Sequence, residues 1–126
     1  MSYLGLDVGT SGCKAVVFDI SGHPLASASR EYAVISSQPH WAELDSCQVG
    51  DACLEVIAEA AAQCPHDRVQ GLGISSQGEA FTLLDGQGKV LANAMVSSDS
   101  RAIRQVRTFP FDPIRLYEKT GHTAHP

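Results

Sequence analysis

The sequence lacks the features that mark several large classes of protein. It has no apolar run near the roughly 20 residues that a membrane-spanning helix requires, and its first residues show no basic segment followed by an apolar one. It has no basic stripe, and its net charge of −5 argues against nucleic acid as a partner. We therefore expect a cytoplasmic protein with no membrane partner and no nucleic-acid partner.

The four cysteines form no recognisable metal-binding or disulfide pattern. No two of them are separated by only two residues, and no His-x-x-x-His pair accompanies them. Because 44% of the residues are hydrophobic, the chain can build an apolar core without a disulfide framework. We expect free, buried or half-buried thiols in a reducing compartment, and no metal site from the scattered histidines.

The length of 126 residues fits one small domain, and its first third has the pattern of strands. Residues 3–8 are short, apolar and bounded by glycine, and residues 13–19 repeat that character. Turn residues at 21–24 separate them from a half-exposed strand predicted over 25–34. Together these segments predict a three-stranded antiparallel meander.

An amphipathic helix is predicted to follow the meander. Asp45 has the character of a helix N-cap, with Gln48 three residues later as in a capping box. Apolar residues recur at spacings of three and four residues over 49–64, and Pro65 ends the pattern. The apolar run 69–75 then predicts a strand buried next to this helix.

The last third predicts short elements separated by polar loops. Residues 81–84 and 90–92 flank the turn sequence 85–88, which predicts a hairpin. A short helix is expected around residues 103–106, and a last one over 112–121, with an aspartate before the first-turn proline and a glycine at its end. The order of elements predicts an α/β fold with a mixed sheet.

A glycine-rich turn joins the first two predicted strands. Glycines let the backbone bend tightly and approach a ligand closely. The hydroxyl and amide groups between them can face phosphate oxygens, and a carboxylate at the end of the preceding strand can hold Mg²⁺ or its waters. The candidate phosphate-binding residues are Asp7, Gly9, Thr10, Ser11 and Lys14, with Asp7 as the candidate metal ligand.

Two other interpretations of this turn remain open from the residues alone. It can be an ordinary hairpin turn with a surface aspartate. It can also be half of an aspartic protease, although Val8 occupies the position where that chemistry favours Thr or Ser. The nucleotide-binding Gly-x-x-x-x-Gly-Lys-Ser/Thr loop is absent, so phosphate binding here would use a turn between strands.

The motifs, taken in order, resemble the FGGY family of carbohydrate kinases, within the superfamily that includes actin and the chaperone ATPases. The resemblance spans the whole chain and rests on segments 4–11, 14–19, 41–45, 71–77, 83–91, 99–102 and 116–121. It implies that residues 1–126 are the amino-terminal RNase H-like domain of such a kinase. A carboxyl-terminal half would supply a second domain, with ATP and Mg²⁺ bound in the cleft between the two.

The resemblance also implies roles for residues outside the turn. Gln77, Gly78 and Glu79 match the loop that contacts sugar hydroxyls in the family. Asp99 and Arg101 match the last two named residues of its Trp-x-Asp-x-Arg segment. From the residues alone, Glu79 can instead be a solvated loop residue, and the other two a helix N-cap with a helix-surface ion pair.

The sequence departs from the family pattern at two places. Ser97 stands where the family has the tryptophan of that segment, so an apolar wall beside the substrate is lost or comes from elsewhere. Gly78 and Glu79 replace the Met-His pair of many xylulokinase-like members, and the glutamate is closer to glycerol kinases. We expect Trp41 to act as a packing anchor rather than as a platform for the substrate.

The function that this resemblance implies is ATP-dependent phosphorylation of a hydroxyl on a sugar or polyol, in the manner of a xylulokinase. The catalytic base and the adenine contacts would lie in the missing half, so this chain alone should be inactive. The full-length protein is a candidate homodimer. The alternative function is a non-catalytic nucleotide switch of the actin and chaperone ATPase superfamily.

Overall fold

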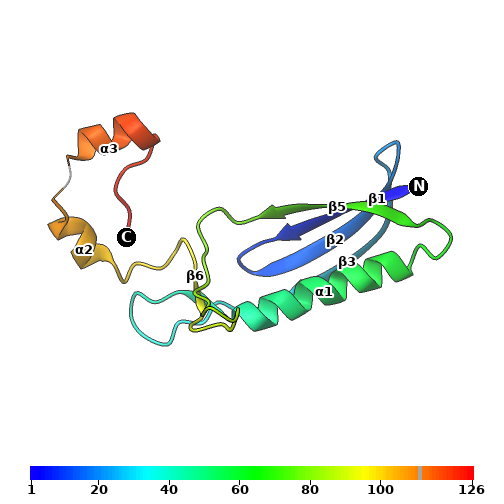
Figure 1. Ribbon diagram of the computed structural model, residues 1–126, viewed down its shortest axis with the longest axis horizontal. Helices are drawn as coiled ribbons and strands as arrows, with labels where there is room; N and C mark the ends of the chain where they lie inside the picture. The colour runs from blue at the N-terminus through cyan, green and yellow to red at the C-terminus, as the bar shows by residue number, and fades with distance from the viewer. Residues whose placement is uncertain (111) are drawn as a thin grey trace.

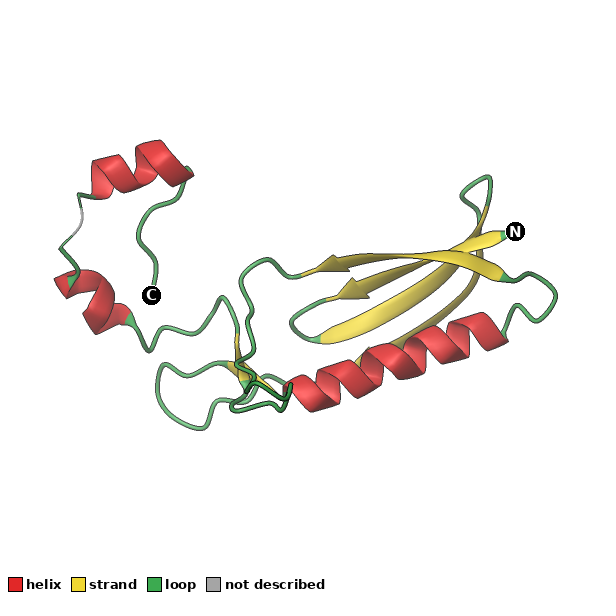
Figure 2. Ribbon diagram, viewed as in Figure 1, coloured by secondary structure: helices red, strands yellow, loops and turns green. Residues whose placement is uncertain are grey.

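A mixed sheet with one long helix across it forms the first part of the chain, and the second part extends away as loops and short helices (Figures 1 and 2). The structure is a computed structural model that describes residues 1–110 and 112–126. The sheet has the strand order β3-β2-β1-β5. Its elements are β1 (Ser2–Val8), β2 (Gly12–Asp19), β3 (Pro24–Glu31) and β5 (Val69–Ser76), with α1 (Ser46–Ala62) as the helix.

The predicted antiparallel meander is confirmed, and the fourth strand runs parallel to its first. In the β1–β2 pair Asp7 lies opposite Lys14, so a very short turn joins the two strands. In the β1–β5 pair Val8 lies opposite Ser76. Because parallel strands end at the same edge of a sheet, the turn after β1 and the loop after β5 leave the sheet side by side.

The core lies between the sheet and α1. Side chains alternate across a strand, so Leu4 and Leu6 of β1 and Val17 of β2 point to the helix side. Val56 and Ala60 of α1 meet them, and all five side chains are no more than 5% exposed. The helix begins where the sequence predicts, because the Asp45 carboxylate accepts the N–H groups of its first turn.

The strand predicted over residues 69–75 is present, but the prediction that it is buried next to the helix is wrong. β5 is one of the two edge strands of the sheet, and α1 packs mainly on β2 and β3, at the other edge. Leu72 and Ile74 of β5 are therefore half or more exposed. The third strand is also shorter than predicted, since β3 ends at Glu31 and the chain then turns toward α1.

The predicted hairpin over residues 81–92 is present as a turn rather than as two strands. The Asp85 carboxylate accepts two backbone N–H groups of the turn, and isolated bridges replace continuous strands among the described residues here. A small two-stranded sheet that the sequence analysis missed forms instead. Its strands are β4 (Glu43–Leu44) and β6 (Ala94–Met95).

Two short helices close the described chain as predicted. They are α2 (Ile103–Thr108) and α3 (Pro113–Thr120). Asp112 caps α3, and Gly121 ends it with a left-handed φ of 73°. None of the helices in the described residues is both long enough and apolar enough to span a membrane.

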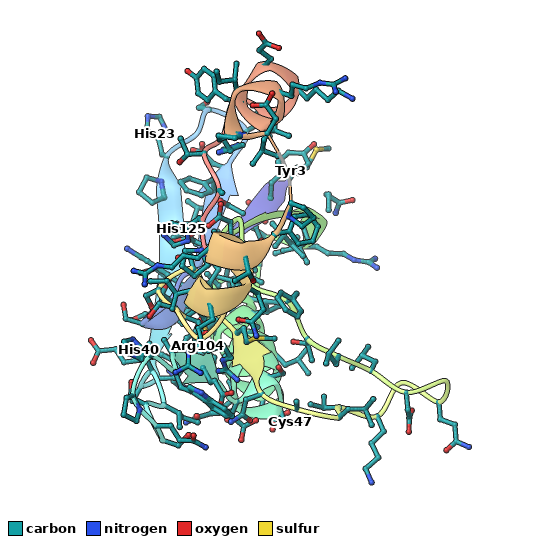
Figure 3. The ribbon with its side chains drawn as sticks, turned by 90° about the vertical axis from the view of Figure 1, so that its left-hand side faces the viewer. Tyr3, His23, His40, Cys47, Arg104 and His125 are labelled. Atoms are coloured by element: carbon teal, nitrogen blue, oxygen red, sulfur yellow. The ribbon has the colours of Figure 1, made fainter. Side chains whose placement is uncertain are left out.

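The four cysteines are free thiols, as expected, but one of them is neither buried nor half-buried. Cys13 is buried under α1, whereas Cys53 and Cys64 are partly exposed. Cys47, which lies in the first turn of α1 and is labelled in Figure 3, is exposed. The prediction of burial is therefore wrong at Cys47 alone.

Candidate functional site

The turn between β1 and β2 is closed by its own backbone. The Gly9 N–H donates to the Gly12 carbonyl at 2.9 Å. A Cβ atom at Gly12 would lie 2.6 Å from the Arg30 carbonyl oxygen, so this position requires glycine for close approach to β3. The turn borders a cavity of about 740 Å³ that also reaches Tyr32.

The turn presents the groups that a phosphate needs. No acceptor among residues 1–110 and 112–126 takes the backbone N–H groups of Thr10 and Ser11. Asp7 and Lys14 are exposed on facing strands, and both line the cavity. Unpaired amides and a lysine suit phosphate oxygens, and one carboxylate with room for water suits Mg²⁺, which keeps several waters when bound.

Tyr32 fixes the turn from the side, and the sequence analysis did not identify it. Its hydroxyl donates to the Gly9 carbonyl at 2.8 Å, and its N–H donates to the Ser11 carbonyl at 3.1 Å. Burial raises the pKa of Tyr32 to about 12, so the hydroxyl stays neutral and keeps its donor proton. Tyr32 therefore holds the turn at both ends.

Gln77 connects the turn to the loop that follows β5. The Thr10 hydroxyl donates to Oε1 of Gln77 at 2.9 Å, and the Gln77 N–H donates to the Val8 carbonyl at 3.0 Å. The glycine-rich turn and the loop that begins at Gln77 therefore meet at one end of the sheet. The side-chain oxygen of Gln77 already accepts this bond, which makes Gln77 a link between the turn and the loop as well as a candidate substrate ligand.

The other candidate substrate residues gather around a second cavity, of about 410 Å³. Glu79, Asp99 and Arg101 line it, together with Ser97 and apolar side chains of the β6 region. Gly78 is exposed, and a Cβ atom there would meet nothing within 4 Å, so no steric contact requires glycine at this position. The structure thus brings three of the five candidates into one cavity.

Arg101 of this cavity lining connects three other side chains. Its Nε donates to both carboxylate oxygens of Asp99 at 2.9 Å, and Nη2 donates to Glu43 at 2.7 Å. The guanidinium carbon lies 3.7 Å from the centroid of the Trp41 ring. We refer to Trp41, Glu43, Asp99 and Arg101 as the arginine cluster.

The arginine cluster keeps Asp99 ionised. The hydrogen bond from Arg101 is the main cause that lowers the pKa of Asp99 to about 2, and burial opposes it. The Ala42 N–H also donates to Asp99, at 2.8 Å. In turn, Asp99 is the main cause that raises the pKa of Arg101.

The interpretation of Asp99 as a helix N-cap is wrong, because α2 starts after Ala102, which makes no side-chain capping bond. The ion pair with Arg101 is present, but it is largely buried rather than on a helix surface. Trp41 packs on the arginine, which agrees with its expected role as an anchor. The contact between Glu43 and Arg101 was not predicted, although residues 41–45 are one of the segments on which the family resemblance rests.

The two cavities remain separate in the described residues. Gln77 lines a further, smaller cavity together with Val8 and Ser76. The chain end returns to the second cavity, where His125 and Pro126 form part of its lining. Figure 3 looks along the molecule from this side, with Arg104 of α2 and His125 near the viewer.

Comparison with known proteins identifies the class. Residues 2–126 match the N-terminal domain of the FGGY family of carbohydrate kinases. The chain is 37% identical over 131 residues to the L-xylulose/3-keto-L-gulonate kinase of Escherichia coli, covering 98% of this chain and 26% of that protein. It is 41% identical over 106 residues to the glycerol kinase of Leptothrix cholodnii, covering 80% of this chain and 21% of that protein.

Solved structures give the same result for the fold. The crystal structure of xylulose kinase from Rhodospirillum rubrum matches with a TM-score of 0.93 and 29% identity, covering 98% of this chain and 26% of that one. The chain belongs to the FGGY family of carbohydrate kinases and is the N-terminal part of such a kinase. It spans about a quarter of the length of the relatives it matches.

Proposed function

We propose that this chain holds the phosphates of ATP and a hydroxylated substrate side by side in a sugar or polyol kinase. The observation that supports this most directly is the hydrogen bond between Thr10 and Gln77. It joins the turn with unpaired backbone amides to the loop that leads to Glu79. A kinase needs these two regions at a fixed separation, because phosphoryl transfer depends on alignment more than on covalent chemistry by the protein.

In this proposal each candidate residue has a physical task. The amides of Thr10 and Ser11 and the charge of Lys14 would hold phosphate oxygens, and Asp7 would hold Mg²⁺ through its waters. Glu79 would accept hydrogen bonds from substrate hydroxyls. ATP supplies the transferred phosphoryl group when it is bound.

The second cavity would hold the substrate in a fixed orientation. Arg101 can donate to a substrate oxygen while Asp99 fixes its guanidinium plane. The residue that removes the hydroxyl proton is expected outside this chain, so these residues bind and orient. The proposal places the full-length enzyme in the cytoplasm, where ATP is available and where free thiols persist.

The test uses the full-length protein with Mg-ATP and a panel of pentuloses, polyols and glycerol. Glu79→Ala should raise the KM for the substrate or lower kcat by about 10- to 1,000-fold, because a hydroxyl partner is lost. ATP binding, measured by calorimetry, should stay unchanged. Asp51→Asn on the exposed side of α1 is the control and should leave both values unchanged.

The same experiment separates the kinase from a nucleotide switch. A switch would bind and hydrolyse ATP, and Glu79→Ala would change neither property. No sugar or polyol in the panel would then be phosphorylated. That pair of results would refute the proposal and leave only nucleotide binding at the turn.

A further inference from the structure

We propose that Glu43 is a positioning residue of this kinase, which holds the guanidinium of Arg101 so that Nη1 is the group left for a ligand. The inference rests on the proposed function, because it concerns how the second cavity is prepared for its substrate. It goes further by assigning a task to a side chain outside the lining of that cavity. The observation that carries it is the way in which two carboxylates share one guanidinium.

The backbone of Glu43 is fixed between neighbouring segments of the chain. Glu43 bridges Ile35 on one side and pairs with Met95 of β6 on the other. Its N–H and its carbonyl exchange hydrogen bonds with Ile35 at 3.0 and 2.8 Å. Met95 also bridges Phe81, which lies two residues after Glu79. Glu43 is therefore held relative to both of the segments that carry the cavity residues.

The side chain of Glu43 is held as firmly as its backbone. The residue is only 8% exposed, and both of its carboxylate oxygens have partners. Oε1 accepts from Nη2 of Arg101 at 2.7 Å, and Oε2 accepts from Nδ2 of Asn93 at 3.2 Å. A buried carboxylate requires such partners, because its removal from water is costly. The two bonds together set the orientation that the carboxylate presents to Arg101.

The two carboxylates take one edge of the guanidinium and leave the other. Nε donates to Asp99, and Nη2 donates to both Asp99 and Glu43, so that three of the five N–H groups are used. Trp41 covers one face of the group. Among residues 1–110 and 112–126, no acceptor takes the two N–H groups of Nη1. The donor that Arg101 can offer to a ligand is therefore Nη1.

Glu43 contributes what Asp99 alone cannot. With Asp99 as the single partner, one N–H of Nη2 would stay open and would compete with Nη1 for a ligand or for water. Glu43 closes that position, and it does so from β4 rather than from the loop that carries Arg101. Because binding and transfer depend on the exact placement of a donor, a guanidinium free to turn would hold its ligand less well.

The test measures two Michaelis constants of the full-length kinase with Mg-ATP and the best substrate of the panel. Glu43→Ala should raise the KM for the substrate about tenfold, because a charge-assisted bond that orients the donor is lost. The KM for ATP should change less than twofold. Glu43→Gln keeps an acceptor oxygen for Arg101 and should restore the substrate KM to within about threefold of the wild type.

Glu55→Ala is the matched control. Glu55 of α1 also pairs with an arginine, but both side chains are exposed. Its loss should leave both Michaelis constants unchanged. A change in the substrate KM as large as that of Glu43→Ala would contradict the inference, because the effect would then not depend on the contact with Arg101.

A double-mutant cycle tests whether Glu43 acts through Arg101. Arg101→Lys keeps the positive charge beside Asp99 but lacks the planar fork that can be oriented. In this background Glu43→Ala should raise the substrate KM less than twofold further. If the two effects multiply instead, Glu43 acts independently of Arg101 and the inference is wrong.

Asn93→Ala provides a milder variant in case Glu43→Ala does not fold. It removes the bond to Oε2 of Glu43 and leaves the contact with Arg101 in place. It should raise the substrate KM about threefold and leave the KM for ATP unchanged. An unchanged substrate KM in this variant would count against the inference.

The outcomes distinguish this inference from the proposed function. Equal rises in the two Michaelis constants, or a lower melting temperature with an unchanged substrate KM, would make Glu43 a purely structural residue. The inference would then fail and the kinase function would stand. If the wild type phosphorylates no compound of the panel, the proposed function itself fails.

Discussion

The turn after β1 and the arginine cluster are held in place by opposite means. The turn is fixed by shape, through the close approach of Gly12 to β3, and by uncharged hydrogen bonds from Tyr32 and Gln77. The arginine cluster is fixed by ion pairs between partly and fully buried charges. The turn is thus held by partners without charge, whereas the arginine cluster is built around charged groups.

The largest effect is expected at Gly12, whose close approach to β3 leaves no room for a side chain. Gly12→Ala places a methyl group 2.6 Å from a backbone carbonyl of β3, which cannot rotate away. We expect a loss of about 3 kcal/mol in the free energy of unfolding, as for overpacked positions, and loss of measurable ATP binding. Chemical denaturation and calorimetry on the full-length kinase measure the two effects.

Gly50→Ala is the matched control for Gly12→Ala. Gly50 lies inside α1, and a Cβ atom there would meet nothing within 4 Å. Alanine should raise the free energy of unfolding by about 0.5–1 kcal/mol, because it restricts the unfolded chain more than glycine does. Equal effects of the two substitutions would show that the turn is not held by shape.

The arginine cluster should give the next largest effect, and a dependence on pH. Asp99→Ala leaves the Ala42 N–H without its acceptor and leaves Arg101 with Glu43 as its remaining carboxylate partner, which should cost about 2 kcal/mol. Because the folded-state pKa of Asp99 is lowered from 3.8 to about 2, its contribution is complete above pH 4 and is lost as the pH falls toward 2.

Urea unfolding of the wild type and of Asp99→Ala between pH 7 and pH 2 measures this contribution. The difference between the two free energies should be constant down to about pH 4 and should then decrease. A Gly12→Ala variant, by contrast, should differ from the wild type by the same amount throughout. A constant difference for Asp99→Ala would mean that its charge does not stabilise the cluster.

A smaller effect is expected at Tyr32. Tyr32→Phe removes the hydroxyl that donates to the Gly9 carbonyl and should raise the KM for ATP by about fivefold, the equivalent of one neutral hydrogen bond of about 1 kcal/mol. The KM for the sugar should change less than twofold. Tyr3→Phe is the control, because the Tyr3 hydroxyl contacts only exposed Met1 among the described residues. A shift in melting temperature without a shift in KM would reduce Tyr32 to a structural role.

The smallest effect is expected at an ion pair outside both sites. Glu59 of α1 pairs with Arg30 of β3 at 2.7 Å, and both side chains are well exposed. Glu59→Gln should change the melting temperature less than any substitution above, because solvent and salt screen such pairs. A decrease in melting temperature as large as that caused by Asp99→Ala would show that the buried Asp99–Arg101 pair stabilises the fold no more than the exposed Glu59–Arg30 pair.

Local features of the fold could be predicted from the sequence, and distant contacts could not. The strands around Gly9 and the Asp45 cap were correct because each depends on neighbours in the chain. The exposure of β5 was not predicted, because the position of α1 on the sheet depends on its tertiary contacts with β2 and β3.

The candidate functional site shows the same difference between local features and distant contacts. The turn was identified from its own residues, but its hydrogen bond to Gln77 spans 67 positions and its brace by Tyr32 spans 23. Glu43 reaches Arg101 across 58 positions. No spacing rule within one element connects such pairs, so only the resemblance to a family placed Asp99 and Arg101 near a substrate.

Trp41 is the single tryptophan among these 126 residues, and it lies against the guanidinium of Arg101. Its indole emission should therefore change when a ligand that binds Arg101 moves the neighbouring cation. Tryptophan fluorescence of this domain would then report directly on occupancy, without a dye and without turnover.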